Sequence, residues 1–167
     1  HHLGTLLGLF MAAYEVNAFK DDYQARILEN AKAFARALKD VGLDVAGDPD
    51  VSYTETHQVV VRVGYGKGPE IAGRLEENNI IVNYQAAPDE EGFTASGALR
   101  MGVSEMTRFG MRAADFVELA QLIHDVVVDG KTVTPAVIDL RARFLDMQFC
   151  FSPEEFEGAI EQIHQLI

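Results

Sequence analysis

Arg100 is the residue of this sequence with the clearest capacity to bind a ligand. In residues 97–103, strand alternation places Ala98, Arg100 and Gly102 on one face of a β-strand. The small neighbours leave room for a planar anion to meet the guanidinium through two parallel hydrogen bonds. Spacing alone favours a plainer interpretation, a surface ion pair with one of the 26 acidic side chains, because such pairs are common.

The other reactive residue types do not form a recognisable catalytic or metal-binding pattern. His57 and His124 are far apart in the sequence and no carboxylate completes a ligand set, so we expect no metal site. Cys150 lies between two phenylalanines, which indicates a buried thiol rather than a nucleophile. The glycines of residues 64–68 lack the Lys-Ser/Thr that follows in a phosphate loop, and the acidic run 89–91 is most simply a solvated loop.

The elements that would position Arg100 are helices and short strands in alternation. Apolar residues at helical spacing predict helices over residues 3–14, 21–41, 69–79 and 113–128, and two further helices start at 134 and 152. Apolar and β-branched runs predict strands over residues 58–63, 80–84 and 98–103. The predicted fold class is α+β (an α/β layer), with a small mixed or antiparallel sheet covered by helices. The first helix is apolar over a broad face, whose partner we expect in a domain outside this chain.

Length and charge restrict the classes of partner. The 167 residues suit one domain with a substantial core. A net charge of −12 repels phosphate backbones and anionic lipid, so nucleic acids and membranes are poor partners. The single cysteine can form no intrachain disulfide, which fits the cytoplasm. Because the chain starts in a helical pattern without methionine, we expect a fragment of a longer protein; His1 and His2 are either native or the end of a tag.

One stretch resembles a known family. Residues 94–110 read TASGALRMGVSEMTRFG and resemble the segment of the serine (glycine) hydroxymethyltransferase family that reads roughly Ser-Gly-Ile-Arg-Val-Gly, four residues, then Thr-x-Arg-Gly. Weaker similarities follow in the family's order at residues 2–8, 23–31, 54–57 and 80–88. The resemblance covers residues 1–128, and the tail beyond Lys131 is not matched.

The resemblance implies the C-terminal portion of a fold-type I pyridoxal-phosphate enzyme. Residues 1–22 would be an interdomain linking helix and residues 23–167 the small domain. Arg100 would bind the carboxylate of serine or glycine, and tetrahydrofolate would accept the one-carbon unit. The whole enzyme would be a cytoplasmic homodimer that holds pyridoxal phosphate mainly through the missing N-terminal part.

Three departures from the family pattern qualify this picture. The family's Schiff-base lysine follows a histidine in a Thr/Ser-rich stretch, and no lysine here has that context, so we expect no catalytic residue in this chain and no activity from it alone. Gln85 stands where many members have an asparagine that contacts folate. Gln85 is therefore a candidate folate contact, although its longer side chain places the amide differently. Ala98 replaces a glycine, and Phe109 replaces a second arginine whose role we do not transfer to Arg108.

Two further functions stay open at this point. Gln85 leaves room for a folate-independent aldolase that acts on a β-hydroxy amino acid. A free-standing, non-catalytic binding module that only shares the fold is the other alternative, and an upstream reading frame with the lysine motif would exclude it.

Overall fold

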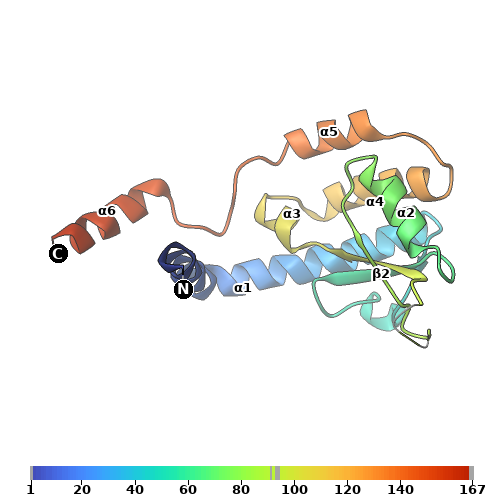
Figure 1. Ribbon diagram of the computed structural model, residues 1–167, viewed down its shortest axis with the longest axis horizontal. Helices are drawn as coiled ribbons and strands as arrows, with labels where there is room; N and C mark the ends of the chain where they lie inside the picture. The colour runs from blue at the N-terminus through green and yellow to red at the C-terminus, as the bar shows by residue number, and fades with distance from the viewer. Residues whose placement is uncertain (1, 91, 93–94, 166–167) are drawn as a thin grey trace.

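The computed structural model of the protein describes residues 2–90, 92 and 95–165 (Figure 1). Its strands are β1 (Asp44–Val45), β2 (Gln58–Arg62), β3 (Asn83–Gln85) and β4 (Ala98–Gly102). Its helices are α1 (Leu3–Asp40), α2 (Gly68–Glu76), α3 (Ser104–Arg108), α4 (Ala113–Val127), α5 (Thr134–Ala142) and α6 (Pro153–His164), with a short 3-10 turn, η1 (Pro49–Val51).

The strands form one antiparallel sheet in the order β1-β2-β4-β3. In this register Arg100 of β4 lies between Val60 of β2 and Asn83 of β3. The predicted α+β class is therefore confirmed, and the sheet is the antiparallel one of the two predicted types. Strand alternation then decides which side chains of β4 face the core and which face away from it.

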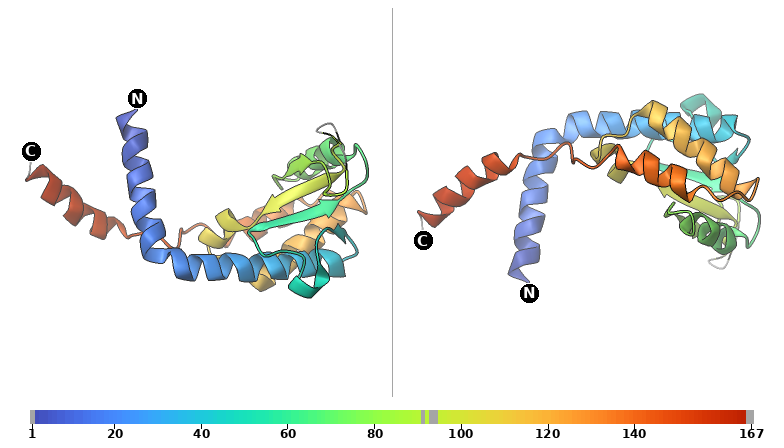
Figure 2. Two further views of the ribbon diagram at one scale, coloured as in Figure 1. Left: turned by 90° about the horizontal axis from the view of Figure 1, so that it is seen from below. Right: turned by 90° about the horizontal axis from the view of Figure 1, so that it is seen from above.

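The core lies between one face of the sheet and the helices α1, α2 and α4. Val59, Val61, Leu99 and Met101 point to this side and are buried. The second half of α1 runs along α4, where the rings of Phe34 and Phe116 lie 5.3 Å apart. The opposite face of the sheet, which carries Arg100, has no helix packed over it in any view (Figures 1 and 2).

The helix α1 is continuous through residues 15–20, although the sequence predicts two helices, over 3–14 and 21–41. That prediction was wrong: aspartates such as Asp21 and Asp22 favour a helix N-terminus, but here they lie inside the helix. An aspartate in a helix interior costs less than about 0.7 kcal/mol relative to alanine, and no glycine or proline occurs between residues 9 and 41. The continuous apolar face from Tyr23 onward packs on the core and keeps the helix intact.

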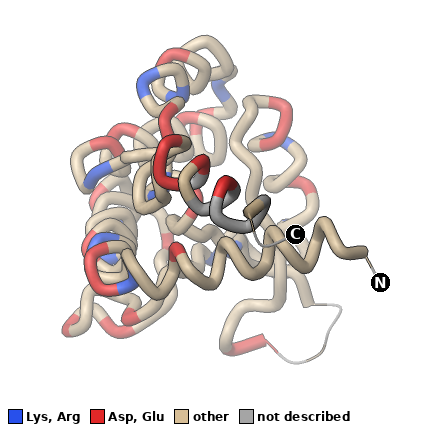
Figure 3. The backbone as a smooth tube through the Cα atoms, turned by 90° about the vertical axis from the view of Figure 1, so that its left-hand side faces the viewer, with Lys and Arg blue, Asp and Glu red and all other residues tan. Residues whose placement is uncertain are grey.

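The first half of α1 leaves the body of the protein. Figure 2 shows the helix bending in this half and projecting away from the sheet. Its large apolar side chains are exposed: Leu3, Leu6, Leu7, Leu9, Phe10 and Tyr14. Figure 3 shows that this half starts as an uncharged stretch, unlike most of the surface. An apolar and uncharged helix of this kind is typical of a segment that packs against another protein surface.

The segment between α5 and α6 returns along α1. The ring of Phe149 lies 5.0 Å from that of Tyr23, and the ring of Phe151 lies 5.3 Å from that of Phe19. The main-chain N–H of Gln148 donates to the carbonyl of Arg108 at 2.7 Å. These contacts connect the C-terminal region to the point where α1 leaves the core, and α6 continues beyond it (Figure 1).

Most of the remaining predicted elements are present. The exception is the predicted strand 80–84: only residues 83–85 pair with β4, and residues 80–82 diverge from it. The two-residue β1 and the single-turn α3 were not predicted. Over the described residues, we find no helix that has the length and apolar character required for a membrane span.

Candidate functional site

Arg100 lies at the centre of the open sheet face. It is half-buried, and its strand neighbours on the same face are Ala98 and Gly102, as the alternation predicts. A Cβ atom on Gly102 would lie 3.6 Å from Cδ2 of His57, in ordinary van der Waals contact, so the imidazole lies beside residue 102. Asn83 faces Arg100 from β3. The sheet thus assembles one cation, one amide and one imidazole on a single surface.

The guanidinium of Arg100 has no protein partner among the residues that the structure describes. Within the part of the chain that the structure describes, it forms no ion pair and no hydrogen bond. The surface ion pair that spacing alone favoured is therefore not formed. By contrast, Arg62 on the same face is paired with Asp89 at 3.0 Å. An unpaired, half-buried arginine on an open face is suited to a carboxylate that arrives from outside.

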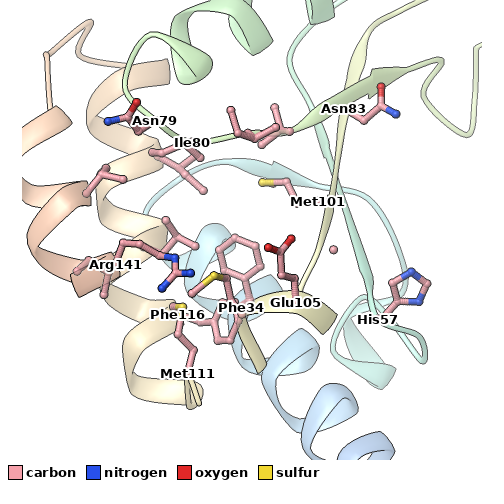
Figure 4. A pocket seen from close by; sticks show the side chains of 18 of the residues that line it. Phe34, His57, Asn79, Ile80, Asn83, Met101, Glu105, Met111, Phe116 and Arg141 are labelled. Atoms are coloured by element: carbon pink, nitrogen blue, oxygen red, sulfur yellow. The ribbon is translucent and has the colours of Figure 1, made fainter. Parts of the chain in front are cut away.

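A cleft opens beside Arg100, with a volume of about 1050 Å³. Its polar end is formed by His57, Asn83, Arg100 and Glu105, and Figure 4 shows the Glu105 carboxylate pointing into it. Its interior is apolar and ends on the following buried side chains: Phe34, Met101, Met111, Phe116 and Ile123. The cleft therefore joins a charged mouth on the sheet surface to the core of the domain.

Arg141 also lines the cleft but is already engaged. Its guanidinium lies over the ring of Phe109, 4.6 Å from the ring centroid, and donates to the carbonyl of Phe144. Of the two arginines that line the cleft, Arg100 is thus the one whose hydrogen-bond donors are available to a ligand.

Gln85 lies on the same sheet face as Arg100. It ends β3, pairs in register with Ala98 and is half-buried. Diagonal residues on adjacent antiparallel strands lie roughly 7–8 Å apart, with their Cβ atoms somewhat closer, so one ligand of moderate size can reach both side chains. Asn83 was noted only as part of the family pattern, although the same alternation places it beside Arg100.

The loop after β3 is closed by an acidic side chain. Oε2 of Glu90 accepts hydrogen bonds from the main-chain N–H groups of Ala87 and Gly97, at 2.6 and 3.0 Å. A Cβ atom on residue 97 would lie 1.9 Å from the other Glu90 oxygen, so a side chain there would displace the Glu90 carboxylate. Asp89 accepts from Arg62, and this hydrogen bond lowers the pKa of the Asp89 carboxyl. The interpretation of this run as a solvated loop holds for Asp89, which is exposed, but was wrong for Glu90, and Glu91 lies outside the described residues.

Three of the remaining polar candidates, Asp125, Asp129 and Cys150, already have local partners. His124, Asp125 and Asp129 bring possible metal-ligand atoms within 4.8 Å of one another. The ammonium of Lys131 already lies 3.3 Å from Asp125 and 2.7 Å from Asp129, where a metal would bind. The half-buried thiol of Cys150 donates to the carbonyl of Met147 at 3.5 Å.

Comparison with known proteins identifies the family. The model of the family described as serine hydroxymethyltransferase matches residues 4–123. The chain belongs to the serine hydroxymethyltransferase family. It is 40% identical over 157 residues to a serine hydroxymethyltransferase of Saccharolobus islandicus, and 36% identical over 159 residues to one of Nitrosopumilus maritimus. The resemblance seen in the sequence is thus confirmed.

A solved structure supports the same assignment. The L-threonine transaldolase of Pseudomonas fluorescens superposes with a TM-score of 0.78 at 30% identity, over 91% of this chain and 36% of the transaldolase chain. The two hydroxymethyltransferases are also covered over 36% of their length, and this chain over 90%. The chain therefore corresponds to a portion of an enzyme of this family.

Among the described residues, the cleft offers no amine that could form a Schiff base with pyridoxal phosphate. No lysine lines the described cleft, and Lys20, Lys39, Lys67 and Lys131 are exposed elsewhere. The residues fit the carboxylate of a bound amino acid but offer no amine to the cofactor. Arg108, one place before the family's second arginine, instead pairs with Glu15 of α1 at 2.5 Å.

Proposed function

We propose that this chain is the C-terminal part of a pyridoxal-phosphate-dependent hydroxymethyltransferase that interconverts serine and glycine. Residues 1–22 would link it to the preceding domain, and residues 23–167 would form the small domain. Family membership and the unpaired guanidinium of Arg100 on the open sheet face support this proposal. The apolar side chains exposed on the first half of α1 support the proposal that this half packs against the rest of a cytoplasmic homodimer.

Arg100 would bind the substrate carboxylate with two parallel hydrogen bonds. A bidentate pair fixes the plane of the carboxylate and so restricts rotation of the amino acid. That restriction decides which bond at the α-carbon is presented to the cofactor, whose ring supplies the electron sink when bound by the rest of the enzyme. Asn83 and His57 border the same space and would face the bound amino acid.

Gln85 is our candidate contact for tetrahydrofolate. Its amide can donate to and accept from a pterin ring, and it shares a sheet face with Arg100. The alternative function is folate-independent cleavage of a β-hydroxy amino acid, which the departure from asparagine at residue 85 leaves open. The similarity to an enzyme named L-threonine transaldolase is a specific observation in favour of this second candidate. A non-catalytic module is the least supported reading, because the named relatives are enzymes.

The two functions separate in one experiment on the full-length enzyme. We expect serine to be converted to glycine only when tetrahydrofolate is present, because formaldehyde is a poor free product. Product formation is followed by amino-acid analysis with and without tetrahydrofolate. If threonine is converted at the same rate with and without tetrahydrofolate, and serine is not converted, the enzyme is the aldolase instead.

The chain alone should be inactive. We expect no serine conversion and no single modified lysine after incubation with pyridoxal phosphate and borohydride, because no lysine borders the cleft of the described chain. Peptide mass spectrometry locates any adduct, and the full-length enzyme serves as the positive control. A one-to-one adduct at a single lysine with turnover of serine would overturn this prediction.

A further inference from the structure

We propose that the ion pair between Glu15 and Arg108 is a positioning pair, which fixes the direction of the first half of α1 relative to Arg100. Oε2 of Glu15 lies 2.5 Å from a terminal nitrogen of the Arg108 guanidinium. Neither residue lines the cleft, so the pair would act on the reaction only through the placement of Arg100. This inference rests on the proposed function, in which residues 1–22 connect the small domain to the domain that binds the cofactor.

One narrow stripe of the first half of α1 contacts the body of the protein. Of residues 2–22, all are exposed except Met11, Glu15 and Phe19, which follow one another at intervals of four residues. Side chains at this spacing lie above one another on one face of a helix, and Tyr23 continues the row. Among the described residues, the pair with Arg108 is the only side-chain hydrogen bond or ion pair that this half of the helix makes.

The direction of this half has no local cause in the sequence. Figure 2 shows it turned away from the axis of the second half. No glycine or proline follows Gly8 within α1, and sharp bends in helices usually need one of these residues or a group that inserts into the helix. Contacts of the stripe must therefore set the direction, because the other side chains of this half are exposed.

The helix α3 joins this contact to Arg100. Only Val103, which is completely buried, separates the end of β4 from the start of α3. The hydroxyl of Tyr23 donates to the carbonyl of Ser104 at 2.9 Å, which holds the first residue of α3 on α1. Arg108 is the last residue of α3, so its pair holds the other end. A change in the direction of the first half of α1 is thus a change relative to the strand that carries Arg100.

The returning segment, residues 147–151, covers the same stripe. The rings of Phe149 and Phe151 lie against those of Tyr23 and Phe19, which follow Glu15 in the row. Phe149 has a φ of 57°, in the left-handed region that residues with a side chain seldom adopt without tertiary contacts. The segment is therefore held in place on the stripe, where it keeps water from one side of the helix.

Burial distinguishes this ion pair from the surface pairs of the chain. The side chains of Glu15 and Arg108 are 13% and 30% exposed, whereas those of Arg26 and Glu29 in the same helix are 36% and 56% exposed. Water screens a pair less when it is buried, and removal of one partner leaves the other charge uncompensated. Among the described residues, Arg108 has no other acidic partner. Loss of Glu15 should therefore release the first half of α1 from α3.

The test replaces Glu15 with alanine in the full-length enzyme. We expect kcat for serine to fall about tenfold or more, because a displacement of about 1 Å in a reacting group can reduce a rate by about 100-fold. KM should change less than about threefold, since Arg100 and its strand are untouched. Glycine formation is measured per mole of bound cofactor, which is determined from its absorbance, so that a smaller folded fraction does not alter the result.

Glu29→Ala is the matched control, because it removes an exposed ion pair with Arg26 from the same helix. Its kcat and KM should equal those of the parent enzyme. A charge exchange adds a second test. Arg108→Glu alone should lose at least as much kcat as Glu15→Ala, because it brings two acids together. The double variant with Glu15→Arg and Arg108→Glu restores the pair in reverse and should return to within about threefold of the parent.

The outcomes separate this inference from the proposed function. A normal kcat per bound cofactor in Glu15→Ala, with a lowered melting temperature, would show that the pair only stabilises the fold. A raised KM with an unchanged kcat, or a charge-exchanged enzyme no better than Arg108→Glu, would also overturn the positioning role. A parent enzyme that converts no serine would contradict the proposed function instead. The ratio of variant to parent, measured with threonine, would then decide the role of the pair.

Discussion

Replacing Arg100 with lysine in the full-length enzyme should raise the dissociation constant for serine about 30-fold, which corresponds to about 2 kcal/mol. Lysine keeps the positive charge but presents a point cation in place of a planar fork, so the two parallel hydrogen bonds to the carboxylate are lost. The melting temperature should stay unchanged, because Arg100 has no ion-pair partner to lose among the described residues. Serine affinity is read from the change in cofactor absorbance during titration.

Arg62→Lys is the matched control for this substitution. Arg62 lies on the same sheet face, two residues from the cross-strand partner of Arg100, and pairs with Asp89 and Asp44 near the surface. Its replacement should leave serine affinity unchanged and cost less than about 1 kcal/mol of stability. An Arg100→Lys enzyme with normal serine affinity and a lowered melting temperature would show that Arg100 is structural.

Replacing Asn30 with alanine should reduce the free energy of unfolding by about 3 kcal/mol. Asn30 is completely buried in α1, and its Nδ2 donates to Oγ1 of Thr107 and to the carbonyl of Met111, both at 2.9 Å. Alanine leaves these two buried acceptors without a donor and creates a cavity between α1 and the turn that follows α3. Urea unfolding of this chain, followed by circular dichroism, measures the loss.

Asn17→Ala supplies the comparison within the same helix. Asn17 is exposed in α1, so the substitution has the same intrinsic helix preference without the buried hydrogen bonds. Its effect should stay within about 0.5 kcal/mol. Similar unfolding midpoints for the two variants would mean that the Asn30 amide contributes little to the attachment of α1.

The position of Arg100 could be predicted from the sequence because its determinants are local. Two small residues at alternate positions, and a segment typical of one family, place the side chain on a strand face with free space around it. The absence of an ion pair could not be predicted, since 26 acidic side chains offered partners and only the fold shows that none of those in the described residues reaches it.

The cleft could not be predicted from the sequence, because its cause is not local. Residues 80–82 are Ile-Ile-Val, a run with high strand preference, and nothing local shows that they leave the sheet. Packing of Ile80 into the core decides their path. For α1 the sequence instead predicted a break that is absent. Asp21 and Asp22 are local capping signals, but the long apolar face of the helix packs on the core and keeps the helix continuous.

The contact between Glu90 and Gly97 has a consequence for sequence variation among relatives. Because one Glu90 oxygen occupies the space of a side chain at residue 97, any larger residue there would displace the acid from the two N–H groups that it accepts from. A change at either position alone would open the loop that follows Gln85. The two positions are therefore expected to covary, with an acid at 90 wherever glycine stands at 97, and with a differently built loop wherever either is replaced.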